Sequence, residues 1–239
     1  MLQQTDFRLD AHTHTIASGH AYGTIREMAA AASERGLDLL GVTEHGPGIP
    51  GTCDPIYFCN LSAVPRRLYG VEVLHGCEAN VLDDGTLSLS ARHLKYLDYA
   101  IAGIHLFCYH DAGPEKNTDN VISCMKVGKV RFISHPDSDR MPVQYDRLVQ
   151  AAKEHRVALE VNNSSLLEPE HRPGCVKNYK EMLTLCQRYR SPIIVDSDAH
   201  DPGAVGRFGA ALALLLLLLL KLEQIDNRLE QLLREKKEE

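Results

Sequence analysis

Seven short apolar runs recur along the chain, separated by stretches of helical character, and this alternation constrains the fold more than any other feature. The runs are continuously apolar rather than alternating with polar residues, which is typical of parallel strands buried on both faces. Strands that alternate with helices predict a parallel α/β sheet, either open or closed into a barrel. The expected strands cover residues 7–12, 37–43, 71–78, 99–104, 130–134, 157–161 and 192–196.

Helices are expected between these strands, and the first has a recognisable end. Its Ala-rich sequence stops at Gly36, the residue type that favours the left-handed conformation after a helix. At 239 residues, with no internal repeat and no evident interdomain linker, the chain suits one large domain. The expected helices cover residues 24–35, 61–69, 87–97, 117–126, 145–155 and 176–190.

The C-terminal region is unusual, because residues 214–220 are seven consecutive leucines within an apolar stretch over 208–220. A bilayer span needs about 20 residues, so this stretch is too short to cross a membrane. Residues 221–239 are charged, with leucine and isoleucine spaced three or four apart. We expect a core helix followed by an amphipathic helix; an oligomerisation face or an atypical tail is the alternative. The main domain is predicted over residues 1–212, with 213–239 packed on it or extending it.

Cysteine usage and net charge narrow the class of protein. The seven cysteines form no Cys-x-x-Cys pair, and the N-terminus lacks the features of a signal peptide, which indicates reduced thiols in the cytoplasm. A formal charge of -6 argues against a general nucleic-acid binder. A small anionic substrate stays compatible with this charge, because bound metal dications reverse the local field in a cleft.

Nine potential metal ligands follow the C-terminal ends of six expected strands. Those ends converge on one face of a parallel α/β fold, where sites are built. Side chains in a His-x-His segment point to the same side of a strand. Imidazoles with few carboxylates suit zinc, manganese or iron, and nine ligands suit two or three ions that share a carboxylate. The nine are His12, His14, His20, His45, Glu78, His105, His135, Asp198 and His200.

Each of these residues also has an ordinary structural interpretation. Glu78 could be a hydrogen-bonding core residue, and His135 before Pro136 could simply end a strand. The clustering of the whole set at strand ends favours a metal site over these separate interpretations. His110, in the loop after the fourth strand, is expected to approach the substrate.

An ordered set of motifs over residues 7–209 resembles the PHP (polymerase and histidinol phosphatase) family, and within it the YcdX-like bacterial phosphatases. The motifs are Asp10-Ala-His-Thr-His-Thr, His20, Thr43-Glu-His-Gly, Gly76-Cys-Glu-Ala-Asn80, Gly103-Ile-His105, Ile133-Ser-His-Pro136, Glu160-Val-Asn-Asn-Ser-Ser165 and Asp196-Ser-Asp-Ala-His200. This resemblance implies a distorted seven-stranded (β/α)7 barrel, with a trinuclear site, usually zinc, at the C-terminal ends of the strands. All nine ligand positions of the family match.

The resemblance also implies roles. Glu78 would bridge two metals near His12 and His14, and Asp198 and His200 would complete this buried cluster. The third, more exposed metal would be held by His20, His105 and His135. The nucleophile would be a metal-bound hydroxide held by Glu78, Asp198 and His200. The chain departs from the usual Thr-Asp-His at Glu44, where we expect altered contacts around the ligands rather than a lost metal.

The predicted function is a metal-dependent hydrolase of phosphomonoesters with up to three zinc ions, manganese or iron being alternatives. A PHP-type phosphodiesterase or exonuclease, a non-catalytic metal-binding regulator, and an amidohydrolase barrel are the competing interpretations. The acidic net charge favours the phosphomonoesterase over the nuclease. The intact ligand set disfavours the non-catalytic regulator. Glu78 stands where an amidohydrolase would use a lysine, which disfavours that class. We expect a small phosphorylated substrate, no stable nucleic-acid partner, no membrane association, and a homo-oligomer that is a trimer by resemblance.

Overall fold

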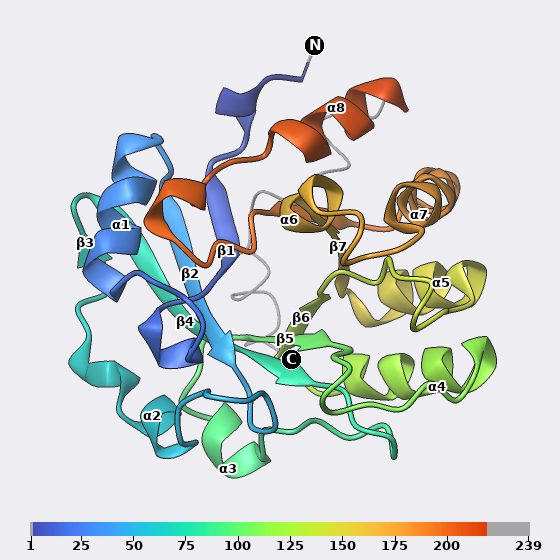
Figure 1. Ribbon diagram of the computed structural model, residues 1–239, viewed down its shortest axis with the longest axis horizontal. Coiled ribbons are helices and arrows are strands. Elements are labelled where there is room, and N and C mark those ends of the chain that lie inside the picture. The colour runs from blue at the N-terminus through green and yellow to red at the C-terminus, as the bar shows by residue number, and fades with distance from the viewer. Residues whose placement is uncertain (1, 219–239) are drawn as a thin grey trace.

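The computed structural model describes residues 2–218, which form a nearly closed barrel of parallel strands surrounded by helices (Figure 1). Neighbouring strands follow chain order, and β3 (Arg67–Leu68) pairs antiparallel with β4 outside this path. All seven expected strands are confirmed, as is the (β/α)7 barrel. The seven are β1 (Leu9–Thr13), β2 (Leu39–His45), β4 (Val71–Asn80), β5 (Ala100–Gly103), β6 (Val130–Ile133), β7 (Ala158–Asn162) and β8 (Ile193–Asp196).

Four of the expected helices are confirmed: α1 (Ile25–Glu34), α4 (Pro114–Met125), α5 (Tyr145–His155) and α7 (Cys175–Tyr189). Gly36 ends α1 at a φ of +74°, and the N–H groups of Gly36 and Leu37 bond back to Ser33 and Ala32, as a glycine cap requires. The remaining elements are α2 (Ile56–Cys59), α3 (Ala91–Leu94), α6 (Asn163–Leu167), α8 (Gly209–Leu217) and the 3₁₀ turns η1 (Gln4–Asp6), η2 (Ile16–Ser18), η3 (Leu61–Ala63) and η4 (Pro202–Ala204).

Two expected helices were wrong in extent or type. The segment 61–69 contains only the short turn η3 before it becomes β3. Pro65 lies between these elements and has no N–H to continue a helical ladder. The helix expected over 87–97 is reduced to the single turn of α3. The pairing of β3 with β4 in the first segment, and the bridge between Leu87 and Val81 in the second, override the local helical pattern.

The strands are apolar on both faces because each face is buried. Outward residues pack under the helices, while one inward set fills the barrel: Leu9, Ala11, Leu39, Leu74, Tyr99, Ile101, Phe132, Ala158 and Ile194. Tyr99 is the largest inward residue, and its hydroxyl donates to the carbonyl of Ala11 at 2.5 Å. Gly41 makes room for it, since a Cβ there would lie 1.9 Å from the Tyr99 hydroxyl oxygen.

The barrel closes between β1 and β8 mainly through side chains. Asp10 of β1 accepts hydrogen bonds from the N–H and hydroxyl of Ser197, and Asp196 of β8 accepts one from the N–H of Ala11 at 2.6 Å. A backbone bridge between Thr13 and Ala199 continues the seam at its C-terminal end. This pattern gives the barrel its distortion, because a full strand ladder is replaced by two buried carboxylates.

Residues 209–217 of the apolar C-terminal stretch form α8, which packs against α6 near the N-terminal segment of the chain (Figure 1). Asn163 caps α8, since its side-chain oxygen accepts from the N–H groups of Ala210 and Ala211. Leu214 and Leu215 are buried. The domain boundary expected after residue 212 falls inside this helix, and the amphipathic helix expected over 221–239 lies outside the described residues. No helix within residues 2–218 is long and apolar enough to cross a membrane.

A buried histidine on β4 makes stability depend on pH. His75 is 2% exposed, and neither ring nitrogen has a hydrogen-bond partner. Burial, with a smaller contribution from the charge of Arg66, lowers the pKa of His75 to about 4 from 6.5. Between these values the unfolded chain takes up a proton that the folded chain refuses, so stability is lost as pH falls from 6.5 toward 4.

We therefore expect His75→Leu to remove part of the acid sensitivity of the metal-free protein. Urea unfolding at pH 7 and pH 4.5 should show that the wild type loses about 2 kcal/mol more than the variant over this interval. An equal loss in both proteins would contradict a neutral His75 in the folded state.

Candidate metal centre

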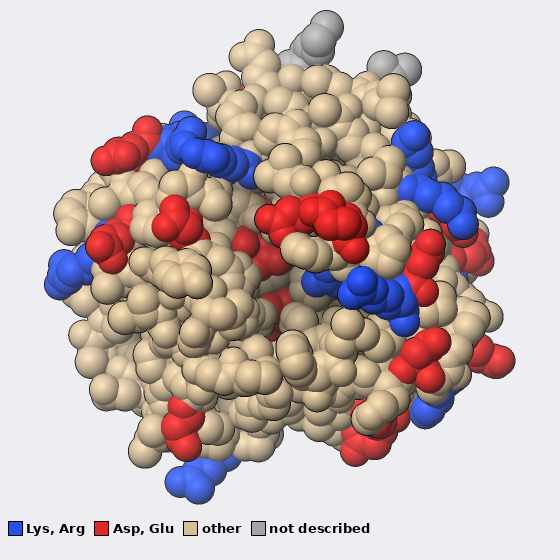
Figure 2. Space-filling view, viewed as in Figure 1, with Lys and Arg blue, Asp and Glu red and all other residues tan. Residues whose placement is uncertain are grey.

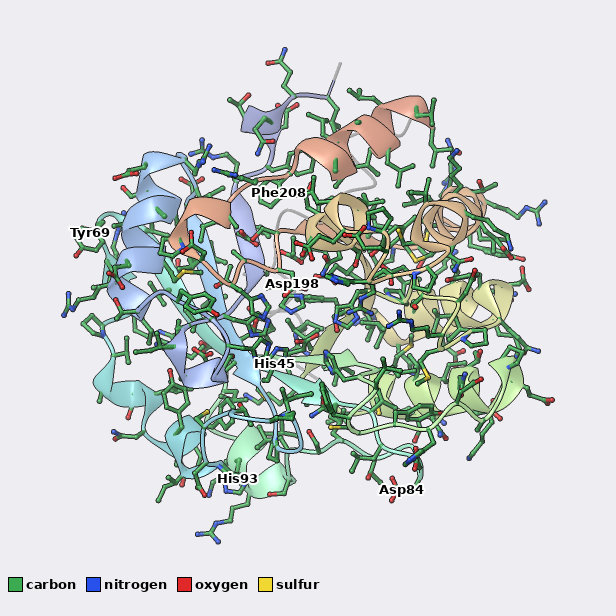
Figure 3. All side chains as sticks on the ribbon, viewed as in Figure 1. His45, Tyr69, Asp84, His93, Asp198 and Phe208 are labelled. Carbon is green, nitrogen blue, oxygen red and sulfur yellow. The ribbon has the colours of Figure 1, made fainter. Side chains whose placement is uncertain are left out.

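The structure brings all nine predicted site residues to the C-terminal end of the barrel. Some lie on the strands, and the others lie in the segments that follow β1, η2, β5, β6 and β8. Figure 3 labels His45 and Asp198, which lie near one another at the centre of the barrel among other nitrogen-bearing side chains. The convergence expected from parallel strands is therefore confirmed for the whole set.

Glu78 lies at the middle of this set, and its two carboxylate oxygens face different histidines. Its Oε2 lies 3.3 Å from Nε2 of His12, 3.5 Å from Nε2 of His14 and 2.9 Å from Nδ1 of His45. Its Oε1 lies 3.4 Å from Nε2 of His105 and 2.8 Å from Nε2 of His135. The carboxylate is thus placed to connect two groups of ligands.

Asp198 is the second carboxylate of the site and lies beside His12 and His14. Its Oδ1 lies 3.4 Å from Nε2 of His12, 3.2 Å from Nε2 of His14 and 3.6 Å from Nδ1 of His200. The side chain of Asp198 is 15% exposed, whereas that of Glu78 is 1% exposed. Asp198 therefore faces the opening of the site, and Glu78 lies at its floor.

The ring of His20 lies against His45 and His200, with ring centroids 4.9 Å and 5.0 Å away. This placement differs from the division implied by the family resemblance, in which His20 joins His105 and His135. The latter two rings lie at Oε1 of Glu78 instead, 5.1 Å from each other. His20 lies in the loop that follows η2, and its ring lies beside that of His45, the last residue of β2, which explains the different grouping.

The donor atoms fit metal ions because they are buried without hydrogen-bond partners. Buried polar atoms are normally satisfied, so a cluster of unsatisfied atoms needs a cause. The ligand atoms of His12, His14 and Asp198 lie within 4.8 Å of one another. The same holds within the group His14, His45 and His200 and within the group His45, Glu78 and His105. Among the nine residues, the unpartnered buried atoms are Nε2 of His12 and His14, Nδ1 of His45 and His135, Oε2 of Glu78 and Oδ1 of Asp198.

Electrostatics favour the metal-binding forms of Glu78 and His14. Burial alone would raise the pKa of Glu78, but the charges of His12, His105 and His135 hold it well below its usual value. Burial lowers the pKa of His14 well below its usual value, helped by the neighbouring His45 and His200. A carboxylate anion and a neutral imidazole are the protonation states that coordinate metals.

The expected strand without a ligand, β7, supplies supporting residues that the sequence prediction did not include. Glu160 accepts from Nδ1 of His12 at 2.7 Å and from the N–H of His135 at 2.7 Å. Asn162 donates to Glu160 and to Oδ2 of Asp198, both at 3.1 Å. Their signal in the sequence is the Glu-x-Asn spacing at a strand end, which points both side chains to the site.

Glu44, where the family has aspartate, supports the loop that carries the ligands. Its carboxylate accepts from the hydroxyl groups of Thr15 and Ser18, at 2.5 Å and 2.6 Å. The Ser18 oxygen in turn lies 3.0 Å from Nδ1 of His14. Glu44 therefore acts on His14 through Ser18 and does not itself join the ligands.

Backbone conformation positions two of the ligands, and a glycine leaves space beside Glu78. His135 and Asp198 have φ values of +31° and +54°, which are uncommon for residues other than glycine. Gly103 clears space for the central carboxylate, since a Cβ there would lie 2.3 Å from Oγ of Ser134 and 3.0 Å from Oε1 of Glu78. The Ser134 hydroxyl uses this space to donate to Glu78 at 2.7 Å.

His110 lies apart from the contacts described above. Its side chain is 91% exposed, and Nδ1 lies 2.8 Å from a carboxylate oxygen of Asp83. Its expected approach to the substrate stays a prediction.

Comparisons with known proteins identify the family of the chain. The PHP domain model matches residues 10–164. The chain is 43% identical to a "Probable phosphatase" of Clostridium novyi over 84% of this chain and 82% of that protein, and 39% identical to one of Acetivibrio thermocellus over 87% and 86%.

Among solved structures, the chain resembles a histidinol phosphate phosphatase of Lactococcus lactis, determined with zinc, L-histidinol and phosphate. The TM-score is 0.62 at 16% identity, covering 90% of this chain and 95% of that chain. This likeness shows a shared fold. The family model and the sequence identities together establish that the chain belongs to the PHP domain family.

Proposed function

We propose that the chain is a metal-dependent hydrolase of phosphate esters that acts on phosphomonoesters with up to three bound divalent ions. The observation that carries this proposal is the buried carboxylate of Glu78, whose two oxygens face two separate groups of histidines. The names of the phosphatase relatives support the reaction class, and the zinc of the Lactococcus lactis structure supports the metal. Manganese and iron are the alternatives for this donor set.

Three groups of residues would hold the ions. The first combines Oε2 of Glu78 with His12, His14 and Asp198, and the second combines Oε1 of Glu78 with His105 and His135. The third comprises His20, His45 and His200, whose rings lie against one another. Bound ions would supply a lowered pKa for an attacking water and positive charge for the phosphoryl oxygens.

The protein's own residues orient these ligands and the reacting groups. Glu160 holds Nδ1 of His12, so that Nε2 presents its lone pair to the centre. Asn80 does the same for His105, with Oδ1 at 2.7 Å from Nδ1. Asp198 and His200 are 15% and 30% exposed, so both can reach a water or substrate in the opening. We propose that they and Glu78 orient the attacking water.

The substrate is proposed to be a small phosphorylated molecule. The formal charge of -6 disfavours a long nucleic acid, which would need many basic contacts. The homo-oligomer stays a prediction.

We expect the zinc-loaded protein to hydrolyse a simple aryl phosphate, and Glu78→Gln to lose both metal and activity. The neutral amide lacks the charge that holds two groups of ligands together. Metal content per chain and the rate of phenol release measure both effects, with Glu72→Gln on the same strand as the matched control. Full metal content with an unchanged rate in Glu78→Gln would refute the assigned centre; an inactive wild type with full metal would refute the reaction.

Glu160→Gln tests the residue that orients His12. We expect zinc affinity to fall by about 10–100-fold, because outer partners of metal-bound histidines contribute this much. A competition titration with a zinc indicator measures the change, and Glu154→Gln on the exposed side of α5 serves as control. An affinity equal to that of the control would mean that Glu160 does not support the metal site.

A further inference from the structure

A cavity of about 220 Å³ lies directly beside two of the proposed metal ligands, His105 and His135. It is bounded by the loop after β5, by α4, by the segment after β6 and by the loop between α6 and α7. Figure 2 shows the face into which the barrel opens, hollowed at its centre, with acidic side chains inside the hollow and basic ones on its right rim. A phosphoryl group at the metals would therefore leave its organic part next to this cavity.

Much of the cavity wall is apolar and open to solvent. Leu106 and Phe107 are 57% and 73% exposed, although both belong to residue types that are usually buried. Met141 and Val143 also line the cavity. Such walls favour an occupant with a flat or compact apolar body.

Two arginines give the same cavity positive charge. Arg172 is 24% exposed, and its nearest carboxylate, Asp137, lies 3.7 Å away, beyond hydrogen-bond distance. Arg140 is exposed and pairs with no carboxylate in the described part of the chain. Guanidinium groups bind planar anions through paired hydrogen bonds, so both arginines have donors available for a ligand.

We propose that this cavity holds the leaving group and that Arg172, assisted by Arg140, selects phosphomonoesters whose apolar organic part carries a second anionic group. The inference rests on the proposed phosphatase function and adds a substrate class to it. The metals would take the ester phosphate, which leaves the arginines for the other anion. L-Histidinol, the ligand in the Lactococcus lactis structure, carries a protonated amine that this cavity would repel.

The test compares two aryl phosphates, phenyl phosphate and 4-carboxyphenyl phosphate, with the zinc-loaded protein. We expect kcat/KM to be about tenfold or more higher for the carboxylated ester, mainly because its KM is lower. A hydrogen bond between charged groups contributes a binding free energy of this size. Arg172→Gln should abolish this preference, and Arg172→Lys should retain part of it. Arg92→Gln, an exposed arginine on α3, is the matched control, and metal content is measured for each protein.

The outcomes separate this inference from the proposed function. Hydrolysis of both esters with equal kcat/KM by the wild type would overturn the inference alone. A loss of rate in Arg172→Gln that is the same for both esters would also overturn it, because Arg172 would then act on the phosphoryl group. No hydrolysis of either ester by fully metallated protein would overturn the proposed function itself.

Discussion

The burial of one carboxylate among five histidines is the interaction on which the rest of the structure depends. A charge removed from water is costly unless it is paired and hydrogen-bonded. Glu78 is compensated by imidazoles on both oxygens and by the hydroxyl of Ser134. Several ligand nitrogens and oxygens around it have no hydrogen-bond partner, and bound divalent cations would satisfy them. A site of this kind requires ligands from many strands to arrive within a few ångströms.

The barrel meets this requirement through its interior. Tyr99 fills the middle of the barrel because Gly41 leaves space for it, and this layer supports the ligands above it. The seam between β1 and β8 is held by Asp10 and Asp196, which fixes the ends of the two strands that carry the opening and closing motifs. The positive φ values of His135 and Asp198 show that the backbone is strained at these two ligand positions, where it sets the direction of the side chains. Stability and chemistry therefore share the same buried polar residues.

The sequence was sufficient to predict the strands and the nine converging residues, because strand burial and strand-end geometry are local signals. It failed where distant residues decide the outcome. The pairing of β3 with β4 overrides a helical pattern, and the grouping of His20 depends on the position of its loop relative to His45. Glu160 belongs to a motif that is recognisable in the sequence, but its contact with His12 depends on the tertiary structure. The cavity near Arg172 combines four separate segments, and no periodicity in the sequence reveals it.

The central claim, that Glu78 joins two metal positions, is tested most directly by a crystal structure of the zinc-loaded protein with anomalous data collected on both sides of the zinc edge. We expect three zinc peaks, with the two oxygens of Glu78 bound to different ions and a third ion among His20, His45 and His200. A single ion, or a Glu78 carboxylate that contacts none, would contradict it.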